Sequence, residues 1–475
     1  MSSSLKTPPR SYSPYDAAMV RSVHVLPHTH WDREWYDPFP TFRDRLVEML
    51  DELLLRLDSD SSFAHFQLDG QMAVVDDYLA VRPEQRELIY KLSNAGRLSM
   101  GPWYVLPDEF LVSGETLIRN LQLGIATAEE FGGAMQVGYL PDMFGHIASM
   151  PQILQLFGFD HAVVWRGVPL SINQPAFNWE SPDGSRVRAE YLSAGYGNGA
   201  GMPSTATELR ERIMMFLEVQ EQLVGREVLW MAGMDHEAPP AHLSAVVAEL
   251  QAAEAVRAQQ HPDQEQLVVK IGSLSEYLER APKQGLLNHS GELRSGARAN
   301  LLMGVTSNRV DVKIAAAVAE RSLERLAEPL STLWATDPMS DQSLLALAWL
   351  EVIRNAAHDS ICACSHDEVV DAVLHRYSEA TRTAEGITRR AITAAASLMT
   401  QSGVLLLNPC SRERYEVIEI ELPASALITQ PAETSLQWVQ ILSERPEHEE
   451  LHVSTAADAP IIVARELIFE HPEPL

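Results

Sequence analysis

The stretch VHVLPHTHWDREW, residues 23–35, decides how this chain begins to fold. Its opening residues, 23–26, alternate and are rich in β-branched side chains, which predicts a β-strand. In an extended chain residues two apart point the same way, so His30 and Asp32 should project together from the strand's end. An imidazole and a carboxylate on one face can begin a divalent metal site, with zinc as the best match. Taken alone, the pair fits a buried histidine and a capping aspartate more often, because two ligands are too few for a typical site.

Around this stretch, short apolar strands alternate with amphipathic helices over residues 21–290. Strands are expected at 22–26, 63–68, 98–100, 136–140, 161–164, 187–191, 227–231 and 267–271. Helices are expected between them, at 42–57, 84–95, 114–131, 150–157, 206–223 and 243–259. This alternation predicts an α/β domain with a mostly parallel sheet and crossover helices.

The remaining chain divides into three further parts. Residues 1–20 are rich in serine and proline and predict a disordered tail without a secretory signal. Residues 291–400 are rich in alanine and leucine at helical spacing, which predicts a helical bundle domain. Residues 401–475 predict the beginning of a C-terminal β domain, a truncated β-sandwich, because strand-like runs such as VLLLNP at 404–409 are followed by too little chain for a large sandwich.

The composition excludes some classes of partner. With a net charge of −28, the chain has no basic field that would attract nucleic acid or an anionic membrane surface, and no apolar run is long enough to span a membrane. Only three cysteines occur, which gives no disulfide framework and indicates a reducing compartment, with the cytoplasm as the expected location. Cys362 and Cys364 have the spacing of a metal or redox pair, but two small side chains beside a functional segment explain them as well.

Three further segments carry candidate chemistry. GYLPDMFGH at 138–146 and WMAGMDH at 230–236 each place an aspartate after a predicted strand, and NAAHDS at 355–360 ends a predicted bundle helix. Catalytic groups of parallel α/β folds lie at the carboxyl ends of strands. Together with residues 30–32, these segments offer two histidines and two carboxylates for a metal, plus a spare acid. That set fits metal-assisted glycoside cleavage, although a single aspartate after a strand is usually a turn or helix-cap residue.

The motifs HTHWDREW, PDMFGH, GMDH and AHD, in this order, resemble those of glycoside hydrolase family 38, the retaining α-mannosidases, and especially its bacterial mannosylglycerate hydrolase branch. The resemblance covers residues 21–475 and implies a distorted β/α barrel, one zinc ion per chain and a mannoside substrate. It assigns four side chains to the zinc ion: His30, Asp32, Asp142 and His358. It also makes Asp142 the nucleophile and Asp235 the general acid/base.

The same resemblance assigns five residues to the sugar site: Trp35, Phe144, Arg166, His236 and Asp359. Trp35 and Phe144 would wall the mannose pocket, and Arg166 would act on the nucleophile and the sugar. Asp359 would bind sugar hydroxyls, and His236 would contact substrate or position the acid. The chemistry is consistent, because a metal-bound carboxylate stays deprotonated for attack, whereas a general acid needs a less polar wall.

Two other functions fit the same residues. A metal-dependent polysaccharide deacetylase also uses histidine and aspartate ligands in an α/β fold, but it needs no distant second acid such as Asp235. A non-catalytic carbohydrate-binding fragment would keep the site without turnover. The aglycone, whether glycerate or a short mannoside, and the existence of a homo-oligomer stay open. His28 and His146 are expected in supporting or core positions, and Asp69 and Asp108 in turns or at the sugar site.

Overall fold

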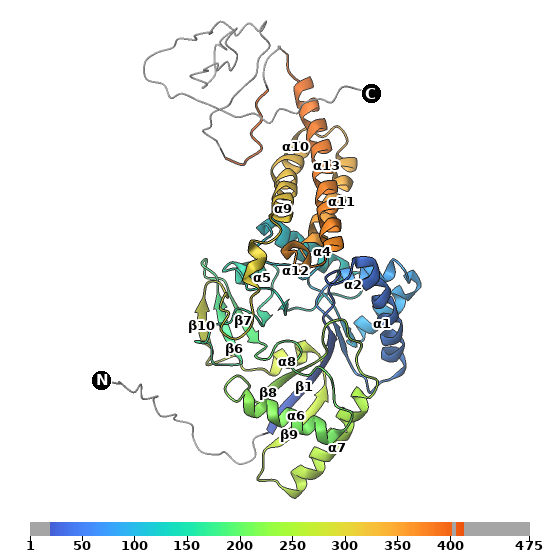
Figure 1. Ribbon diagram of the computed structural model, residues 1–475, viewed down its shortest axis with the longest axis vertical. Coiled ribbons are helices and arrows are strands. Elements are labelled where there is room, and N and C mark those ends of the chain that lie inside the picture. The colour runs from blue at the N-terminus through green and yellow to red at the C-terminus, as the bar shows by residue number, and fades with distance from the viewer. Residues whose placement is uncertain (1–19, 401–404, 413–475) are drawn as a thin grey trace, which may run out of the picture. The chain divides into compact units, whose positions relative to one another are not determined.

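The first sheet is built around β1 (Val20–Thr29) in this computed structural model, which describes residues 20–400 and 405–412 (Figure 1). All of its strand pairs are parallel. Val23 and Val25 on one face and His24 on the other are fully buried, as expected for a central strand that is covered on both faces. The other members of the sheet are β2 (Phe66–Leu68), β3 (Leu98–Ser99), β8 (Glu227–Ala232) and β9 (Gln266–Ile271).

The second sheet also has five strands, in the order β10-β6-β7-β5-β4. Only β6 and β7 pair in antiparallel fashion. The predicted mostly parallel arrangement is therefore confirmed, and the barrel is distorted in that its strands lie in two sheets. The bounds of these strands are β4 (Gly138–Leu140), β5 (His161–Val164), β6 (Ala176–Glu180), β7 (Arg186–Tyr191) and β10 (Leu287–Ser290).

Eight helices belong to the α/β part of the described chain, and the six helices predicted there are confirmed with shifted ends. The sequence patterns missed α2 and α8, which have seven residues each. The 3₁₀ turn η1 (Pro83–Gln85) precedes α3. The helices are α1 (Phe39–Ser59), α2 (Ala73–Leu79), α3 (Arg86–Asn94), α4 (Gly114–Glu129), α5 (Met150–Leu156), α6 (Ala206–Val219), α7 (Leu243–Gln260) and α8 (Leu274–Arg280).

A helical bundle follows, as predicted: α9, η3 and α10 form one continuous helical run that lies beside α11 and α13 (Figure 1). The short α12 (His358–Cys362) contacts the α/β part directly, since the His358 backbone N–H donates to the carbonyl oxygen of Leu106 over 3.1 Å. The other elements are η2 (Met303–Thr306), α9 (Val310–Ser322), the π-helical η3 (Leu323–Ala327), α10 (Glu328–Trp334), α11 (Pro338–Asn355) and α13 (Asp367–Ser397).

Two strands and part of one prediction need comment. The sequence patterns missed β6 and β10. β10 is an exposed, polar edge strand whose conformation depends on pairing with β6. β6 is a short strand that forms a hairpin with β7. Residues 405–412 contain no strand, and the rest of the predicted β domain lies outside the described residues, as does the predicted tail at 1–19.

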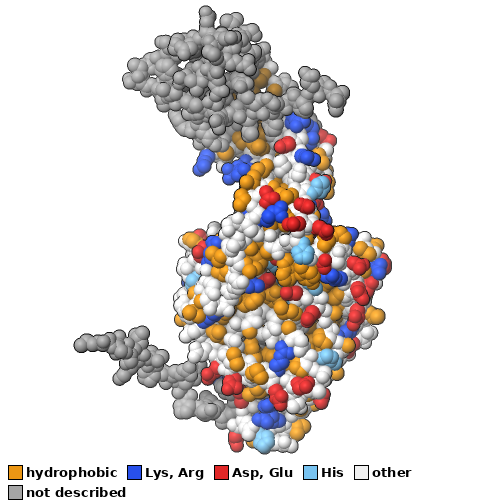
Figure 2. All heavy atoms as spheres, in the orientation of Figure 1, with side chains coloured by type: hydrophobic (Ala, Val, Ile, Leu, Met, Phe, Trp, Pro, Cys, Tyr) orange, Lys and Arg blue, Asp and Glu red, His pale blue; other side chains and the backbone are white. Residues whose placement is uncertain are grey.

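Two features of the described residues concern the surface and the apolar content of the helices. Acidic side chains are interspersed with basic ones over the face shown in Figure 2. No helix in the described part of the chain combines the length and apolar character that crossing a bilayer requires.

Candidate active site

His30 and Asp32 meet His358, which is more than 300 residues away in the sequence, at one buried point. One ligand atom from each of His30, Asp32 and His358 lies within 4.8 Å of the other two. Asp32 Oδ1 is 3.2 Å from His30 Nε2 and 3.4 Å from His358 Nε2. Asp142 joins them, because its Oδ2 lies 3.5 Å from His358 Nε2 and 3.9 Å from His30 Nε2. The structure thus brings together all four side chains that were expected to bind zinc.

These residues come from the ends of separate elements. His30 and Asp32 follow β1, Asp142 follows β4, and His358 begins α12. A parallel bridge between His30 and Asp235 brings the segment after β8 to the same edge. The carboxyl ends of strands from both sheets therefore converge with a helix of the bundle, which is where catalytic groups of parallel α/β folds are expected.

Each histidine is held by its Nδ1 atom. His30 Nδ1 lies 3.0 Å from Asp69 Oδ1, and His358 Nδ1 lies 3.2 Å from the carbonyl oxygen of Leu106. An oxygen acceptor keeps the proton on Nδ1, so the Nε2 lone pair points into the cluster. His30 Nε2 is buried and has no hydrogen-bond partner among the described residues. Two imidazoles and two carboxylates arranged in this way fit a divalent cation such as zinc.

Asp69 lies in the turn after β2, one of the two positions expected for it, and supports His30. It is fully buried, with a left-handed φ of 35°. Its Oδ2 accepts hydrogen bonds from the Trp31 backbone and from Gln71 Nε2, each over 2.8 Å. The sequence left its role open, and its position directly after β2 was the only signal.

The cluster carries an excess of negative charge. Burial would lower the pKa of His30, but the carboxylates of Asp69 and Asp32 raise it well above 6.5. Burial would also lower the pKa of His358, but the carboxylates of Asp359, Asp142 and Asp32 raise it to about 10. In the metal-free protein both imidazoles therefore hold protons between carboxylates at neutral pH, and a dication can take the place of those protons.

Asp142 uses its two oxygens differently. Oδ2 faces the histidine nitrogens, whereas Oδ1 accepts from Arg166 Nε over 2.7 Å and lies 2.6 Å from Nη2. Arg166 follows β5, and its Nη1 also donates to the carbonyl oxygen of Asn300 over 2.6 Å. The guanidinium thereby fixes the orientation of the carboxylate.

Asp235 stands beside the cluster in a different environment. Its Oδ1 accepts a hydrogen bond from the Tyr196 hydroxyl over 2.8 Å. Burial raises the pKa of Asp235 above its ordinary value, and the nearby carboxylates of Asp32 and Asp142 add to this. Sequence reasoning missed Tyr196; the available signal was its place in a glycine-rich turn after β7.

Phe144 and Asp359 lie beside His358, and Trp35 contacts the segment after α12. Phe144 meets the His358 ring edge-on, with centroids 5.5 Å apart. Asp359 Oδ1 accepts from the Cys364 thiol over 3.0 Å, and burial together with nearby carboxylates raises the pKa of Asp359 to about 8. Trp35 is half-buried, and its Nε1 donates to the carbonyl oxygen of Cys364 over 3.2 Å.

His236 lies against Asp32, with both ring nitrogens engaged by the protein. Its Nε2 accepts from the Asp32 backbone N–H over 3.1 Å, and its Nδ1 is 3.1 Å from the Tyr36 hydroxyl. The ring also packs on Phe42, with centroids 4.4 Å apart. This geometry makes His236 a support for Asp32, and its contact with substrate stays a prediction.

The other residues singled out in the sequence have supporting positions. His28 Nε2 is 2.8 Å from the carbonyl oxygen of Tyr196, and His146 Nδ1 is 2.6 Å from Glu109 Oε1. Both histidines are fully buried. Asp108 Oδ1 accepts two backbone hydrogen bonds, from residues 110 and 111, as a turn residue does.

Comparison with known families agrees with this geometry. The family model described as the glycosyl hydrolases family 38 N-terminal domain matches residues 20–293, which is more than half of the chain. The chain belongs to glycoside hydrolase family 38. The alpha mannosidase middle domain matches residues 300–394, and this range contains the bundle helices and His358.

Family 38 proteins with names and structures cover most of this chain. A Halalkalibacterium halodurans protein provisionally named a mannosylglycerate hydrolase is 34% identical over 381 residues, which is 76% of this chain and 41% of that protein. An alpha-mannosidase structure from Enterococcus faecalis V583 aligns with a TM-score of 0.72 and 31% identity, covering 79% of this chain and 43% of the other. The chain therefore spans less than half the length of these relatives.

Proposed function

We propose that this chain carries the catalytic site of a zinc-dependent retaining α-mannosidase that cleaves terminal α-mannosides through a covalent glycosyl-enzyme intermediate. The observation that carries the proposal is the position of Asp142, with Oδ2 at the histidine cluster and Oδ1 on Arg166. Family membership and the names of its relatives support a mannoside as the substrate, with mannosylglycerate and short mannosides as the two candidates.

Asp142 is the proposed nucleophile. One bound zinc ion would supply positive charge that keeps the carboxylate ionised and would bind sugar hydroxyls. Arg166 also favours the ionised carboxylate, since it donates hydrogen bonds to Oδ1, the oxygen that faces away from the histidine cluster. The ionised Asp142 attacks the anomeric carbon while the bond to the aglycone oxygen breaks, which leaves the sugar esterified to Asp142.

Asp235 is the proposed general acid and base. Its raised pKa favours the protonated form, which can donate a proton to the departing aglycone oxygen. In the second step Asp235 takes a proton from water, and that water hydrolyses the ester on Asp142. A retaining mechanism requires about 5–5.5 Å between the two carboxyl groups, and proton NMR of the first-formed product would show retention of the α configuration.

The sugar site proposed from the sequence consists of Trp35, Phe144, Arg166, His236 and Asp359. Aromatic faces suit the apolar side of a pyranose, which favours Trp35 and Phe144 as its walls. Asp359, whose Oδ2 is 3.9 Å from His358 Nε2, is close enough to the cluster to bind hydroxyls held there.

Release of p-nitrophenol from an α-mannoside by the zinc-loaded protein tests the proposal. Asp142→Asn should abolish turnover and weaken zinc binding. Asp235→Asn should keep zinc and slow turnover by about 10²–10⁴-fold on substrates with poor leaving groups, but less on activated ones. If Asp235→Asn matches the wild type on every substrate, the acid/base assignment is wrong.

The same protein distinguishes the two alternatives. Acetate release from an acetylated sugar, without mannosidase activity, would favour a deacetylase. Binding of zinc and mannose without any turnover would favour a non-catalytic carbohydrate-binding fragment.

A further inference from the structure

A buried ion pair ties the helix that carries His358 to the strand end that carries Asp32. Glu34, two residues after Asp32, pairs with Arg376 of α13. The same Glu34 oxygen accepts a hydrogen bond from Ser360 Oγ of α12 over 2.7 Å. Glu34 is 2% exposed and Ser360 is 1% exposed. One carboxylate oxygen therefore joins the segment after β1 to two helices of the bundle.

Arg376 is fixed on its other side. Its Nε donates to Asn355 Oδ1 over 2.5 Å, and Asn355 Nδ2 donates to the carbonyl oxygen of Val373 over 2.9 Å. Asn355 is fully buried and is the last residue of α11. The guanidinium thus has hydrogen-bond partners on two elements, and a partly buried guanidinium held by two hydrogen-bonding partners keeps its geometry more strictly than an exposed surface pair.

The short helix α12, which contacts this network through Ser360, is not stable on its own. α12 contains five residues, which is far below the length at which a helix is stable alone in water. Its first residue, His358, supplies one proposed zinc ligand, and its third residue, Ser360, is bonded to Glu34. The position of the imidazole therefore depends on contacts that α12 makes with its surroundings.

We propose that Glu34 and Arg376 are positioning residues that hold His358 at ligand distance from Asp32 and thereby set the affinity of the site for its cation. This inference rests on the proposed metal site. A metal site tolerates errors of only about 0.5 Å in the placement of its ligands. The ligands here come from the α/β part and from the bundle, and the Glu34–Arg376 pair spans that division.

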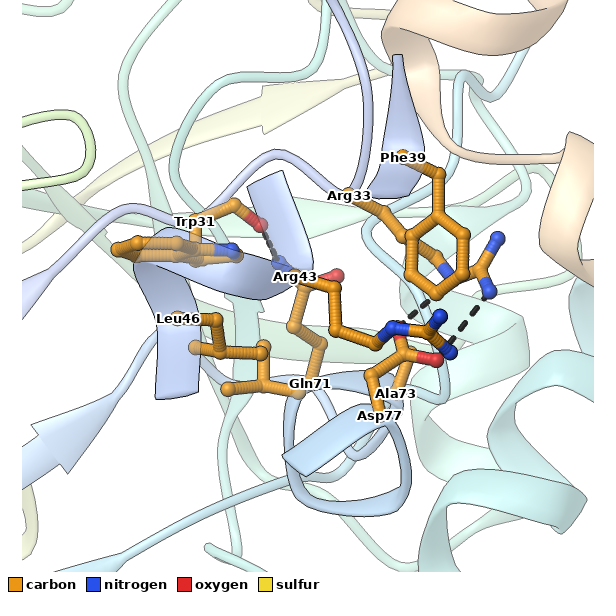
Figure 3. Close-up of a pocket in the computed structure, with 9 residues that line it drawn as sticks. Trp31, Arg33, Phe39, Arg43, Leu46, Gln71, Ala73 and Asp77 are labelled. Carbon is orange, nitrogen blue, oxygen red and sulfur yellow. Dashed lines mark hydrogen bonds and ion pairs between the residues drawn. The ribbon is translucent and has the colours of Figure 1, made fainter. Parts of the chain in front are cut away.

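The chain offers two other ion pairs for comparison. Arg33 bonds to Asp77 of α2, through Nε over 2.8 Å and Nη2 over 3.2 Å, beside a small pocket (Figure 3). That pair holds the same segment but does not reach α12. Arg390 pairs with Asp341 and joins α13 to α11, about 21 Å along α13 from Arg376. The second pair is the matched control, because it belongs to the bundle but lies away from the cluster.

The test is a titration of the metal-free chain, residues 1–475, with Zn²⁺ and with Co²⁺. The double variant Glu34→Gln/Arg376→Met removes both charges and leaves no buried charge unpaired. Its Kd for the cation should rise about 10–100-fold. The control Asp341→Asn/Arg390→Met should keep the wild-type Kd, even where its melting temperature falls. The single variant Arg376→Lys keeps the charge, so its Kd should lie between that of the wild type and that of the double variant.

Two results would overturn the inference, and they have different meanings. If the Glu34/Arg376 variant loses melting temperature but binds the cation as tightly as the wild type, the pair only stabilises the fold while the metal site stands. If the wild type binds neither cation, the proposed metal site fails and the positioning role fails with it. Should the double variant not fold, Arg376→Lys provides the comparison, because it keeps both charges and loses only part of the hydrogen bonds of the guanidinium.

Discussion

Single hydrogen bonds decide which atoms of the site can react. The Nδ1 contacts of His30 with Asp69 and of His358 with the Leu106 carbonyl leave the two Nε2 atoms facing Asp32 Oδ1. The Arg166 contact leaves the other oxygen of Asp142 facing the same point. Each supporting contact therefore presents one electron pair to the position where a cation and a sugar would meet.

Tyr196→Phe should move the alkaline limb of the pH–rate profile upward by about one pH unit. The Tyr196 hydroxyl donates to Asp235 and so stabilises its carboxylate, which opposes the effect of burial on the pKa. Without that bond Asp235 keeps its proton to higher pH and stays active as an acid. The measurement is kcat/KM against pH on a mannoside with a poor leaving group.

A second buried tyrosine provides the control for this prediction. Tyr277 donates to Glu190 over 2.6 Å, away from the described site. Tyr277→Phe loses a comparable hydrogen bond and should leave the alkaline limb in place. A limb that moves to lower pH in Tyr196→Phe would contradict the assignment of Asp235 as the acid.

At the scale of elements, the close approach of β8 to β1 places Asp235 beside His30, and Gly233 makes it possible. A Cβ at Gly233 would lie 1.9 Å from the carbonyl oxygen of His28. Gly233→Ala should therefore push the two segments apart, lower the free energy of unfolding by about 1–3 kcal/mol and reduce zinc affinity and turnover together. Chemical denaturation and zinc titration measure these effects.

Gly304→Ala is the matched control, because no atom lies within 4 Å of a Cβ placed there. It should change neither stability nor zinc binding appreciably. A Gly233→Ala protein with wild-type stability and zinc affinity would show that the approach of the two strands is not what positions the ligands.

Periodicity predicted the long elements and the strand ends, and with them the neighbourhood of His30, Asp142 and Asp235. It could not predict contacts between distant segments, since nothing near Glu34 in the sequence indicates a partner 342 residues away. Tyr196 was missed for the same reason, because its partner Asp235 lies on another strand end. The short β10 was missed because its conformation comes from pairing rather than from its own residues.

At the scale of the whole molecule, the proposed cation joins two parts of the chain. His30, Asp32 and Asp142 belong to the α/β part, and His358 belongs to α12 after the first bundle helices. A ligand that binds only when both parts are in place stabilises the folded chain as a unit, by about 2.7 kcal/mol at a free concentration 100 times its Kd. Chelation should accordingly lower the melting temperature reversibly.

This stabilisation by zinc should grow between pH 6 and pH 9. Burial would lower the pKa of His358, but the carboxylates of Asp359, Asp142 and Asp32 raise it to about 10 in the metal-free protein. Because that pKa lies above its ordinary value of 6.5, protonated His358 contributes stability that is fully present below pH 6.5 and is lost as pH rises through 10. Zinc needs the neutral imidazole, so the proton competes with it, and this competition weakens about tenfold for each unit of pH. Calorimetry at a constant, buffered concentration of free zinc should show that the zinc-induced rise in melting temperature becomes larger as the pH increases. In His358→Gln this rise should depend less on pH. If the rise is the same at every pH in the wild type, zinc does not displace this proton.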